Sequence, residues 1–453
     1  MEIKDLYERF LQHPTITTDS RDVPEGSLFF ALKGETFDGN AYAKAALEKG
    51  AAYAIIDEKE FAEEGNERLI LVEDVLTTLQ QLAAYHRVQL GTTIIGITGT
   101  NGKTTTKELI ATVLKKKYNV LYTQGNFNNH IGVPKTLLQL TKAHEMAVIE
   151  MGANHPGEIK TLVEIVQPNY GIITNVGKAH LLGFGSFEGV IRTKGELYDF
   201  LRKTNGTVFI NNDNPHLKGI SQGLKLVKYG QQDAEGLLVK GEIVECNPFL
   251  KFEWEEKDNG QRTTDNGGGT TDYGQQTTDK GWVQTQLIGS YNLDNALAAA
   301  CIGTFFEVAA EDISAALEEY TPSNNRSQLT VTKDNRLVVD AYNANPTSMK
   351  AALDNFRYIK DDHKMCILGQ MGELGDVSEE EHQKVIDLIG EGGFEQVWLV
   401  GENFAKTNHP DNYRLFANVD EVKTVLATQK PKGFLILIKG SNSNKLVQTV
   451  ELL

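Results

Sequence analysis

The sequence predicts a three-domain α/β protein in which helices cover mainly parallel sheets. The chain has 453 residues, which is too long for one ordinary hydrophobic core. Apolar runs of strand length alternate with helical stretches from residue 93 to about residue 321, and a second alternation begins after Pro322. We therefore expect a small α/β domain over residues 1–85, a parallel-sheet domain over 86–321 and a Rossmann-like doubly wound domain over 322–453.

The individual elements follow from short-range patterns. Residues 1–85 contain short strand-like runs and turn residues, with a helix expected around residues 41–49. In the two larger domains, each expected strand is a short apolar run bounded by polar residues. These strands are residues 94–98, 146–151, 171–175 and 207–211 in the middle of the chain, and residues 337–340, 365–369, 396–400 and 434–438 near its end.

One segment, at about residues 255–280, breaks the alternation. It contains the runs Asp-Asn-Gly-Gly-Gly-Thr-Thr-Asp and Gln-Gln-Thr-Thr-Asp and almost no apolar residues. Such a composition cannot bury enough surface to offset the entropy lost on ordering. We expect a solvent-exposed hairpin tip or a flexible insertion at the edge of the central domain.

The most informative motif is Gly-Thr-Asn-Gly-Lys-Thr-Thr at residues 99–105. It follows an expected strand and opens a segment that is predicted to be a helix beginning at Lys103, although Ile97 stands where the usual pattern has its first glycine. Glycines in such a turn let backbone N–H groups approach phosphate, the helix N-terminus favours an anion, and Lys103 adds positive charge. The hydroxyl of Thr104 suits the magnesium of a nucleoside triphosphate, so we expect a central P-loop ATPase domain.

Three later residues could complete this site. Glu150 closes an apolar run, where a carboxylate can hold magnesium, but it could also cap the strand or pair with a lysine. His180 follows the next expected strand, and a lone histidine of this kind could be a metal ligand or a structural residue. Lys194 lies in an expected helix, where periodicity alone predicts a solvated side chain.

Composition restricts the partners. The net charge of −16, with no basic tract to offset it, argues against nucleic acid as a general partner. No apolar run approaches the roughly 20 residues that cross a bilayer. The first residues lack a basic stretch followed by an apolar core, and the three cysteines have no metal-ligand spacing. We expect a cytoplasmic monomer without membrane insertion.

Taken together, these stretches resemble the Mur ligase family of ATP-dependent amide-bond-forming enzymes of peptidoglycan synthesis. The resemblance extends along nearly the whole chain. It rests on Thr-Gly-Thr-Asn-Gly-Lys-Thr-Thr at residues 98–105, on Glu150, His180 and Lys194, on Gly-Ser-Tyr-Asn-Leu-Asp-Asn-Ala at residues 289–296, and on Arg326 and Asp340.

Four further runs narrow the resemblance within the family. They are Asn-Phe-Asn-Asn-His-Ile-Gly-Val-Pro at residues 126–134, Gly-Ala-Asn-His-Pro-Gly-Glu-Ile at 152–159, Asp-Ala-Tyr-Asn-Ala-Asn-Pro at 340–346 and Leu-Gly-Gln-Met-Gly-Glu-Leu-Gly at 368–375. They are similar to runs in the members that add D-alanyl-D-alanine to UDP-N-acetylmuramoyl-tripeptide. The Asp-Asn-Pro-Arg-like motif of the diaminopimelate- or lysine-adding members is not found in the sequence.

The resemblance implies a reaction and a set of roles. ATP would phosphorylate the carboxylate of the UDP-linked tripeptide, and the amine of D-alanyl-D-alanine would attack the acyl phosphate, giving the UDP-linked pentapeptide, ADP and phosphate. Catalytic roles are implied for Lys103, His180 and Lys194. Mg²⁺ would be held by Thr104, Glu150, His180 and Lys194, the last of these as a carbamate.

The resemblance also implies binding residues. ATP would be bound by Gly99, Thr100, Asn101, Gly102, Lys103, Thr104 and Thr105, by Asn292 and Asn295 near the adenine, and by Arg326 at phosphate and Asp340 at the ribose. Ser20 and Arg21 would hold the UDP end of the first substrate, and Asn128 and Asn129 its sugar-peptide part. On the residues alone, residues 19–21 could equally be a polar turn and Asn292 a helix N-cap.

Three positions depart from the family pattern. They are Tyr291, where many relatives have histidine, Gln370, where an acidic residue is common, and Asn442, where arginine is usual. The change at Asn442 removes a positive charge that would lie near the substrate.

Other functional classes fit the sequence less well. A guanine-nucleotide switch would share the phosphate loop but normally carries Asn-Lys-x-Asp, which the sequence lacks. A catalytically silent scaffold is disfavoured because Lys103, Glu150 and Lys194 are all present. Folylpolyglutamate synthetase relatives share the central domain, yet they lack a first domain of this kind.

Overall fold

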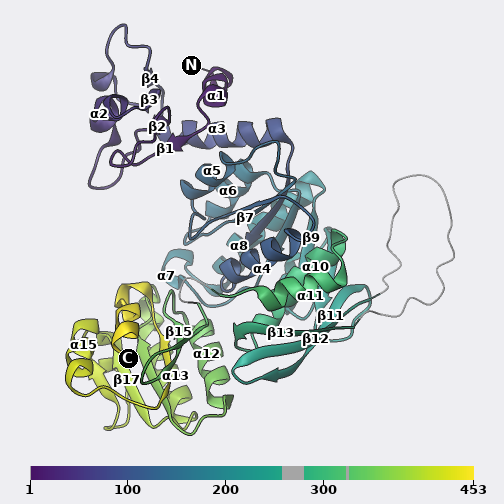
Figure 1. Cartoon of the computed structure of the whole chain (residues 1–453), viewed down its shortest axis with the longest axis vertical. Helices are drawn as coiled ribbons and strands as arrows, with labels where there is room; N and C mark the ends of the chain where they lie inside the picture. The colour runs from purple at the N-terminus through teal and green to yellow at the C-terminus, as the bar shows by residue number, and fades with distance from the viewer. Residues whose placement is uncertain (1, 258–279, 323–325) are drawn as a thin grey trace, which may run out of the picture.

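The computed structural model describes residues 2–257, 280–322 and 326–453. These residues form three sheets with helices packed around them, arranged in chain order from the top to the bottom of Figure 1. The long helix α3 (Val75–Leu90) runs between the first two units, and the short helix α7 (Leu181–Phe184) lies on the side of the second that faces the third (Figure 1). The predicted three-domain α/β architecture is confirmed.

The N-terminal domain is a small parallel sheet with the strand order β1-β2-β3-β4 among its described residues. Its elements are α1 (Ile3–Gln12), β1 (Ile16–Thr17), β2 (Leu28–Phe30), α2 (Ala43–Glu48), β3 (Tyr53–Ile56), β4 (Leu69–Leu71) and α3, with 3₁₀ turns at Gly39–Tyr42 and Lys59–Phe61. The Asp74 carboxylate caps the start of α3 by accepting from the Thr77 N–H, and Gly91 ends it with a φ of +67°. The predicted boundary between residues 85 and 86 falls inside this helix.

One hydrophobic core joins the N-terminal domain to the central domain. Leu79 and Leu82 of α3 are completely buried in it. The same cluster contains Phe10 of α1, Phe30 of β2 and Val163 of α6 (Glu158–Val166). Because the apolar cluster crosses from one domain to the other, these two parts should unfold together.

The central domain has a nine-stranded sheet in its described residues, in the order β13-β12-β11-β10-β9-β8-β5-β7-β6. The part from β6 to the β10–β11 pair is parallel, and β11, β12 and β13 form an antiparallel extension. The strands are β5 (Thr93–Thr98), β6 (Val120–Tyr122), β7 (Met146–Glu150), β8 (Tyr170–Ile173), β9 (Thr207–Asn211), β10 (Lys225–Gly230), β11 (Leu237–Cys246), β12 (Phe249–Glu256) and β13 (Lys280–Ile288). The further helices are α4 (Lys103–Leu114), α5 (Gly132–Leu137), α8 (Phe187–Thr204), α9 (Pro215–Ile220), α10 (Asn292–Phe305) and α11 (Ala310–Glu319).

The strand order of the central sheet places the phosphate loop. Strands β7 and β6 lie on one side of β5, and β8 and β9 lie on the other. The order therefore changes direction at β5, and in open α/β sheets a crevice forms beyond the carboxyl end of a strand at such a point. The loop at residues 99–102 lies at this position.

The C-terminal domain has a six-stranded sheet in its described residues, in the order β14-β15-β19-β16-β17-β18. Only the β14–β15 pair among these neighbours is antiparallel. The strands are β14 (Gln328–Val331), β15 (Arg336–Asp340), β16 (Lys364–Gly369), β17 (Gln396–Val400), β18 (Arg414–Phe416) and β19 (Leu435–Lys439). The helices are α12 (Pro346–Tyr358), α13 (Ser378–Gly390), α14 (Glu402–Ala405) and α15 (Val419–Thr428), with 3₁₀ turns at Gly375–Val377, Asn442–Asn444 and Leu446–Leu452.

The strands predicted from apolar runs are confirmed, and their ends differ by at most two residues from those observed. The antiparallel extension was not predicted, because its strands carry charged residues on one face and give no continuous apolar run. The predicted insertion at residues 255–280 lies, except at its ends, outside the described residues. The strands on either side of it, β12 and β13, pair antiparallel with Glu255 opposite Lys280.

Among the helices that the structure describes, none is both long enough and apolar enough to traverse a lipid bilayer.

The shared core makes a prediction about stability. Replacing Leu82, which is 0% exposed, by alanine should lower the free energy of unfolding by about 2–5 kcal/mol, because it leaves a cavity in the cluster that joins two domains. Urea denaturation followed by circular dichroism measures this change. Leu11→Ala is the control, because Leu11 of α1 is 57% exposed and its loss should cost less than about 0.5 kcal/mol. Equal losses in the two variants would contradict the shared core.

Candidate active site

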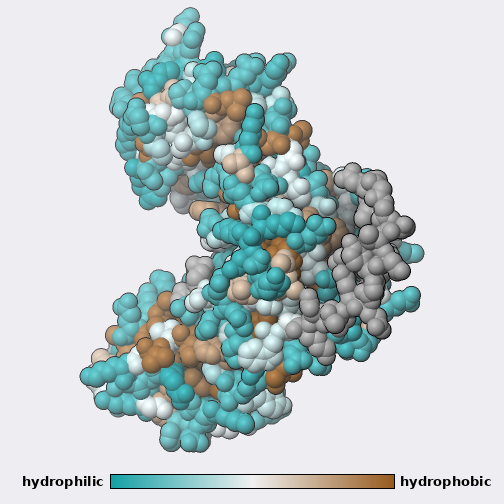
Figure 2. All heavy atoms as spheres, turned by 45° about the vertical axis from the view of Figure 1, so that its right-hand side comes forward, coloured by the Kyte–Doolittle hydropathy of each residue, from teal (hydrophilic) through white to brown (hydrophobic). Residues whose placement is uncertain are grey.

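A cavity of about 760 Å³ lies where the central and C-terminal domains meet. Its wall is formed by the phosphate loop, the loop after β6, the ends of β7, β15 and β19, and the first residues of α10 and α12, with a contribution from α3. The face shown in Figure 2 is mostly hydrophilic and is indented above the C-terminal domain. The cavity therefore brings together residues from all three units of the chain.

The phosphate loop is fixed by the segment that follows β8. Thr174 Oγ1 donates to the Asn101 carbonyl (2.6 Å), and the Asn175 side chain both donates to that carbonyl (3.0 Å) and accepts from the Asn101 N–H (3.0 Å). A Cβ on Gly99, whose φ is +146°, would lie 2.0 Å from Thr174 Oγ1, so only glycine fits this close approach. Gly102, with a φ of +76°, turns the chain into α4. The geometry is that of a preformed anion site at a helix N-terminus.

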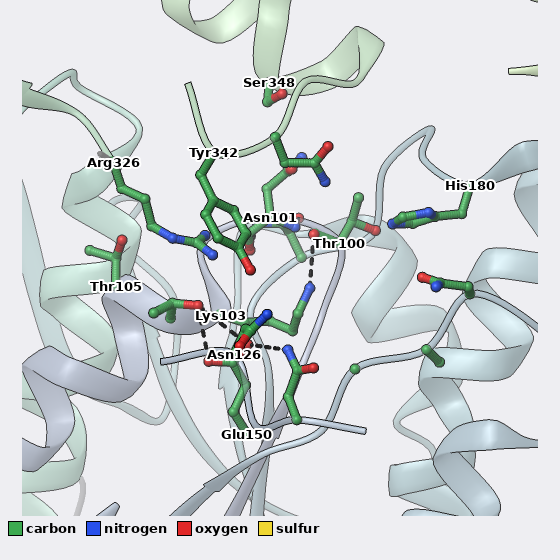
Figure 3. A pocket seen from close by; sticks show the side chains of 18 of the residues that line it. Thr100, Asn101, Lys103, Thr105, Asn126, Glu150, His180, Arg326, Tyr342 and Ser348 are labelled. Atoms are coloured by element: carbon green, nitrogen blue, oxygen red, sulfur yellow. Dashed lines mark hydrogen bonds between the residues drawn. The ribbon is translucent and has the colours of Figure 1, made fainter. Parts of the chain in front are cut away.

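Lys103 lies at the start of α4 with its amine turned back to the loop. Its Nζ donates to the carbonyls of Gly99 (2.7 Å) and Thr100 (3.1 Å), and Figure 3 shows the bond to Thr100. Burial lowers the pKa of the Lys103 amine to about 8, and the nearby Arg326 acts in the same direction while Glu150 opposes it. The amine can exchange its loop carbonyls for phosphate oxygens, which would favour its charged form.

Glu150, at the end of β7, is the buried carboxylate of the site. Thr104 Oγ1 donates to its two oxygens (3.0 and 3.3 Å), and Asn128 Nδ2 donates to Oε1 (2.8 Å). Lys107, one helical turn after Thr104, is completely buried with its Nζ 3.8 Å from Glu150 Oε2. A buried carboxylate is tolerated when hydrogen-bond donors and a positive charge surround it. Glu150 therefore lies beside Thr104 and faces Lys107, as the alternative of a lysine pair has it, and its magnesium role stays a prediction.

The chemistry of this group suits Mg²⁺. A hydroxyl and a carboxylate are hard oxygen ligands, and Mg²⁺ is usually held by one or two such groups together with phosphate oxygens. The described residues contain no cluster of three or more His, Cys, Asp or Glu side chains that could hold a metal ion. A site built by Thr104 and Glu150 would therefore depend on oxygens from a bound nucleotide.

His180 and Lys194 have different environments. His180 lines the cavity, and its Nδ1 is hydrogen-bonded to the carboxylate of Glu373 in the C-terminal domain. Burial lowers the pKa of the imidazole, while Glu373 opposes the shift. Lys194 is buried behind the cavity wall, where its Nζ donates to the Ala153 carbonyl (3.1 Å). Burial holds the pKa of its amine well below the usual value, and the positive charge of Lys103 adds to this effect.

Asn292 and Asn295 belong to a buried chain of hydrogen bonds that joins two helices. Thr106 Oγ1 of α4 donates to Asn295 Oδ1 (3.0 Å), Asn295 Nδ2 donates to Asn292 Oδ1 (2.9 Å), and Asn292 Nδ2 donates to the Ile288 carbonyl (2.8 Å). Both asparagines line the cavity. They are therefore available at its wall, but part of their hydrogen-bonding capacity already joins α10 to α4.

Arg326 enters the cavity from the segment before β14. Its guanidinium carbon lies 3.8 Å from the centre of the Tyr342 ring, and its Nε is buried without a hydrogen-bond partner in the described structure. Figure 3 shows the two side chains together above Lys103. The next residue, Ser327, has a φ of +48° and its Oγ is hydrogen-bonded to the Tyr291 hydroxyl (2.7 Å). Arg326 thus places a cation opposite the phosphate loop whose Nε has no hydrogen-bond partner among the described residues, as a phosphate contact requires.

Asp340, at the end of β15, also lines the cavity, and it is paired with a lysine. The Lys439 Nζ lies 2.6 Å from Asp340 Oδ2. Lys439 is the last residue of β19, and its side chain is buried.

Direct contacts join the central and C-terminal domains around the cavity. The amides of Asn101 and Asn345 are hydrogen-bonded to each other (2.8 Å), and Asn345 also caps α12. The Lys178 backbone N–H donates to Thr347 Oγ1 (3.2 Å), and its side chain pairs with Glu381 (3.2 Å). The phosphate loop therefore touches the first turn of a helix from the other domain.

Several predicted binding residues lie outside the cavity or are already hydrogen-bonded within the protein. Ser20 and Arg21 lie in a turn outside the cavity, where Arg21 is exposed and pairs with Asp19 (2.7 Å). Asn129 lines the cavity, but its Oδ1 accepts from the Gly132 N–H (2.8 Å) at the start of α5. Of the departures, Gln370 Oε1 accepts from the Asn403 N–H (3.1 Å), and Asn442 is exposed.

Sequence reasoning assigned no role to Lys107, Tyr342, Glu373 or Lys439. Two of these gave a usable signal. Lys107 follows Thr104 by three residues, which places both on one helix face. Lys439 directly follows the predicted strand at residues 434–438, and Asp340 ends the one at 337–340, so their positions at the carboxyl ends of two strands were a usable signal. The contact between Glu373 and His180, which are 193 residues apart, had no local signal.

The sequence matches models of three Mur ligase domains. They are described as the Mur ligase family catalytic domain, over residues 14–87, the Mur ligase middle domain, over 97–303, and the Mur ligase glutamate ligase domain, over 325–442.

The chain is similar along its length to proteins named UDP-N-acetylmuramoyl-tripeptide–D-alanyl-D-alanine ligase. The protein of Bacillus subtilis (strain 168) is 33% identical, with 98% of this chain and 94% of the relative covered. The protein of Escherichia coli (strain K12) is 32% identical, with 97% and 93% covered.

Solved structures agree with these relatives. MurF ligase from Thermotoga maritima in complex with ADP has a TM-score of 0.82 at 26% identity, with 98% of this chain and 97% of that chain covered. MurF from Acinetobacter baumannii has a TM-score of 0.81 at 30% identity, with 96% and 93% covered. A folylpolyglutamate synthase from Mycobacterium tuberculosis, with a TM-score of 0.60 at 14% identity and 83% of this chain covered, shares the fold alone.

The environment of Lys103 predicts how nucleotide affinity depends on pH. With a pKa of about 8, Lys103 loses its charge as the pH rises through 8, and bound phosphate would keep it charged. The affinity for ADP should therefore fall by about tenfold between pH 7 and pH 9, since one proton is taken up on binding. Calorimetric titration in EDTA measures this without a metal contribution. Lys103→Met should bind weakly at both pH values, and a steep pH dependence in that variant would contradict the assignment.

Proposed function

The chain belongs to the Mur ligase family, and on this basis we propose that it adds D-alanyl-D-alanine to UDP-N-acetylmuramoyl-tripeptide at the expense of ATP. The products are the UDP-N-acetylmuramoyl-pentapeptide, ADP and phosphate, and the reaction belongs to peptidoglycan precursor synthesis. The observation that carries this proposal is a single cavity that combines a phosphate loop, a buried carboxylate and cations from a second domain.

The tripeptide carboxylate would first be activated. Transfer of the γ-phosphoryl group of ATP to this carboxylate gives an acyl phosphate and ADP. The amine of D-alanyl-D-alanine then attacks the acyl carbon, and a tetrahedral intermediate collapses to the amide with loss of phosphate and a proton. Such steps need reactants held together and negative charge neutralised more than they need a protein nucleophile.

The cations of the cavity fit the neutralising task. Lys103 faces the loop that would hold the β- and γ-phosphates, and Arg326 lies across the cavity with its Nε unpaired. Thr104 and Glu150 would hold Mg²⁺, which neutralises phosphate charge when bound. Asp340 lies at the cavity wall, where its carboxylate could accept a hydrogen bond from a ribose hydroxyl. Asn292 and Asn295 also line the cavity, and Asn295 lies beside Gly102 of the phosphate loop.

A second Mg²⁺ position, formed by His180 and Lys194, requires a change in Lys194. An amine cannot ligate Mg²⁺ while it is protonated, but a neutral lysine amine can react with CO₂ to give a carbamate, whose oxygens resemble a carboxylate. The lowered pKa of Lys194 increases the fraction of reactive neutral amine. We therefore propose that Lys194 is carbamylated, and that His180 releases Glu373 when this position is filled.

The three domains would divide the substrates. Residues 1–85 would hold the UDP end, with Ser20 and Arg21 beyond the cavity described here, while α3 reaches the cavity through Leu76 and Gln80. Asn128 and Asn129 lie between this region and Glu150, in line with a sugar-peptide running from one to the other. Residues 86–321 would bind ATP, and residues 322–453 would present the dipeptide.

An assay of ADP release tests the proposed reaction. We expect release to require both UDP-tripeptide and D-alanyl-D-alanine, and mass spectrometry to detect the pentapeptide. Lys103→Met should lower kcat/KM by roughly a hundredfold or more, because a charge that neutralises the transferred phosphoryl group is lost. ADP release that does not depend on the dipeptide would indicate a hydrolase instead.

Carbamylation of Lys194 is tested without turnover. Protein equilibrated with ¹³C-bicarbonate should show one carbamate carbon signal by NMR that is lost in Lys194→Ala and retained in Lys203→Ala. Lys203 lies on the same helix, α8, but is exposed. A spectrum of the wild-type protein without a signal that depends on Lys194 would refute the modification.

A further inference from the structure

We propose that Lys439 is a positioning residue for the nucleotide, which holds Asp340 so that one carboxylate oxygen is available to the ribose hydroxyls. This inference rests on the proposed function, because it takes ATP as the ligand of the cavity. It differs from that proposal in giving a role to a lysine that would otherwise be taken for a substrate contact.

The sheet brings the two residues together. Strands β15 and β19 are parallel neighbours, and Asp340 and Lys439 are register partners at their carboxyl ends. Lys439 Nζ donates to Asp340 Oδ2 at 2.6 Å and to the Asn343 carbonyl at 3.3 Å. The lysine therefore fixes both the end of β15 and the loop that carries Tyr342.

The burial of the pair makes its geometry specific. The Lys439 side chain is 1% exposed and that of Asp340 is 19% exposed. An ammonium this deeply buried needs a partner, and removing either member of such a pair leaves an uncompensated charge. Among the described residues, Asp340 Oδ1 has no hydrogen-bond donor, and Asp340 lines the cavity. The arrangement uses one oxygen for structure and leaves the other for a ligand.

The charge of Lys439 also affects the ligand. A carboxylate near a triphosphate repels it, and the repulsion is strong where water is excluded. Asp340 is close enough to Tyr291 to contribute to the raised pKa of that phenol, so its charge reaches the central domain side of the cavity. Pairing with Lys439 offsets part of this charge and leaves the hydrogen-bond acceptor in place.

The alternative is that Lys439 itself binds an anionic group of the second substrate. Its burial and its two existing acceptors argue against this, because a substrate carboxylate would have to displace one of them. The two roles predict different losses. A positioning lysine affects recognition of the ribose, whereas a substrate-binding lysine affects the dipeptide.

The experiment compares ADP with 2′-deoxy-ADP and 3′-deoxy-ADP, each with Mg²⁺, by calorimetric titration of the full chain. We expect the wild-type protein to prefer ADP over at least one deoxy analogue by roughly tenfold or more, as loss of a hydrogen bond to a charged group implies. Asp340→Asn and Lys439→Met should each reduce this preference to within about threefold. The double variant should show no further reduction, because the two residues act as one unit.

Lys364→Met is the matched control. Lys364 begins β16, so it lies at the amino end of a strand in the same sheet, and its Nζ donates to helix-end carbonyls, including that of Arg357 at 2.7 Å. Its replacement should lower the melting temperature without changing the ribose preference. Lys439→Gln, which is too short to reach Asp340 in the same way, serves if the methionine variant does not fold, and its preference should also fall.

The outcomes separate the inference from the function on which it rests. A ribose preference retained in Lys439→Met but lost in Asp340→Asn would overturn the role of Lys439, as would a raised KM for D-alanyl-D-alanine with the preference intact. No ribose preference in the wild-type protein would overturn the role of the pair and leave the ligase activity standing. Absence of ADP binding and of ligation in the wild-type protein would instead refute the proposed function.

Discussion

The site depends on one constraint, which is that the carboxyl ends of parallel strands lie side by side at the same end of a sheet, here called its carboxyl edge. In the central domain, β5, β7 and β8 deliver the phosphate loop, Glu150 and Thr174 to one edge. In the C-terminal domain, β15 and β19 deliver Asp340 and Lys439 to another. The two edges line the same cavity, so chemistry that neither sheet holds alone is assembled between them. Everything else in the site orients or neutralises groups at these edges.

Charge compensation explains the particular residues found there. The chain carries a net charge of −16, yet cations gather at the cavity wall and directly behind it. Lys107 lies against Glu150 and Lys439 against Asp340, whereas Arg326 lies over the face of Tyr342 and its Nε has no hydrogen-bond partner among the described residues. The first two cations make buried acids tolerable, and the last is free for phosphate. An acidic protein can therefore present a local site for a polyanion.

The sequence predicted what local patterns encode and missed what depends on pairing across the sheet. The strand–loop–helix at residues 93–114 and the position of Glu150 follow from apolar runs and from the turn chemistry of glycine. The partner of His180 does not, because Glu373 is distant in the chain and belongs to another domain. Asn292 was placed at the cavity, but only the packing of α10 on α4 shows that its amide also supports Asn295. When a side chain has two possible partners, the sequence alone does not determine which of them it contacts.

The contacts between the two larger domains suggest how the cavity is stabilised. The contacts described around the cavity are polar, and Lys178, which pairs with Glu381, is half exposed. Exposed ion pairs contribute about 0–1 kcal/mol each, so these contacts alone hold the domains weakly. A nucleotide with its phosphates on the loop at Lys103 and its ribose at Asp340 would touch both domains at once. Because binding to one arrangement stabilises that arrangement, the ligand itself would supply much of the free energy that keeps the cavity closed.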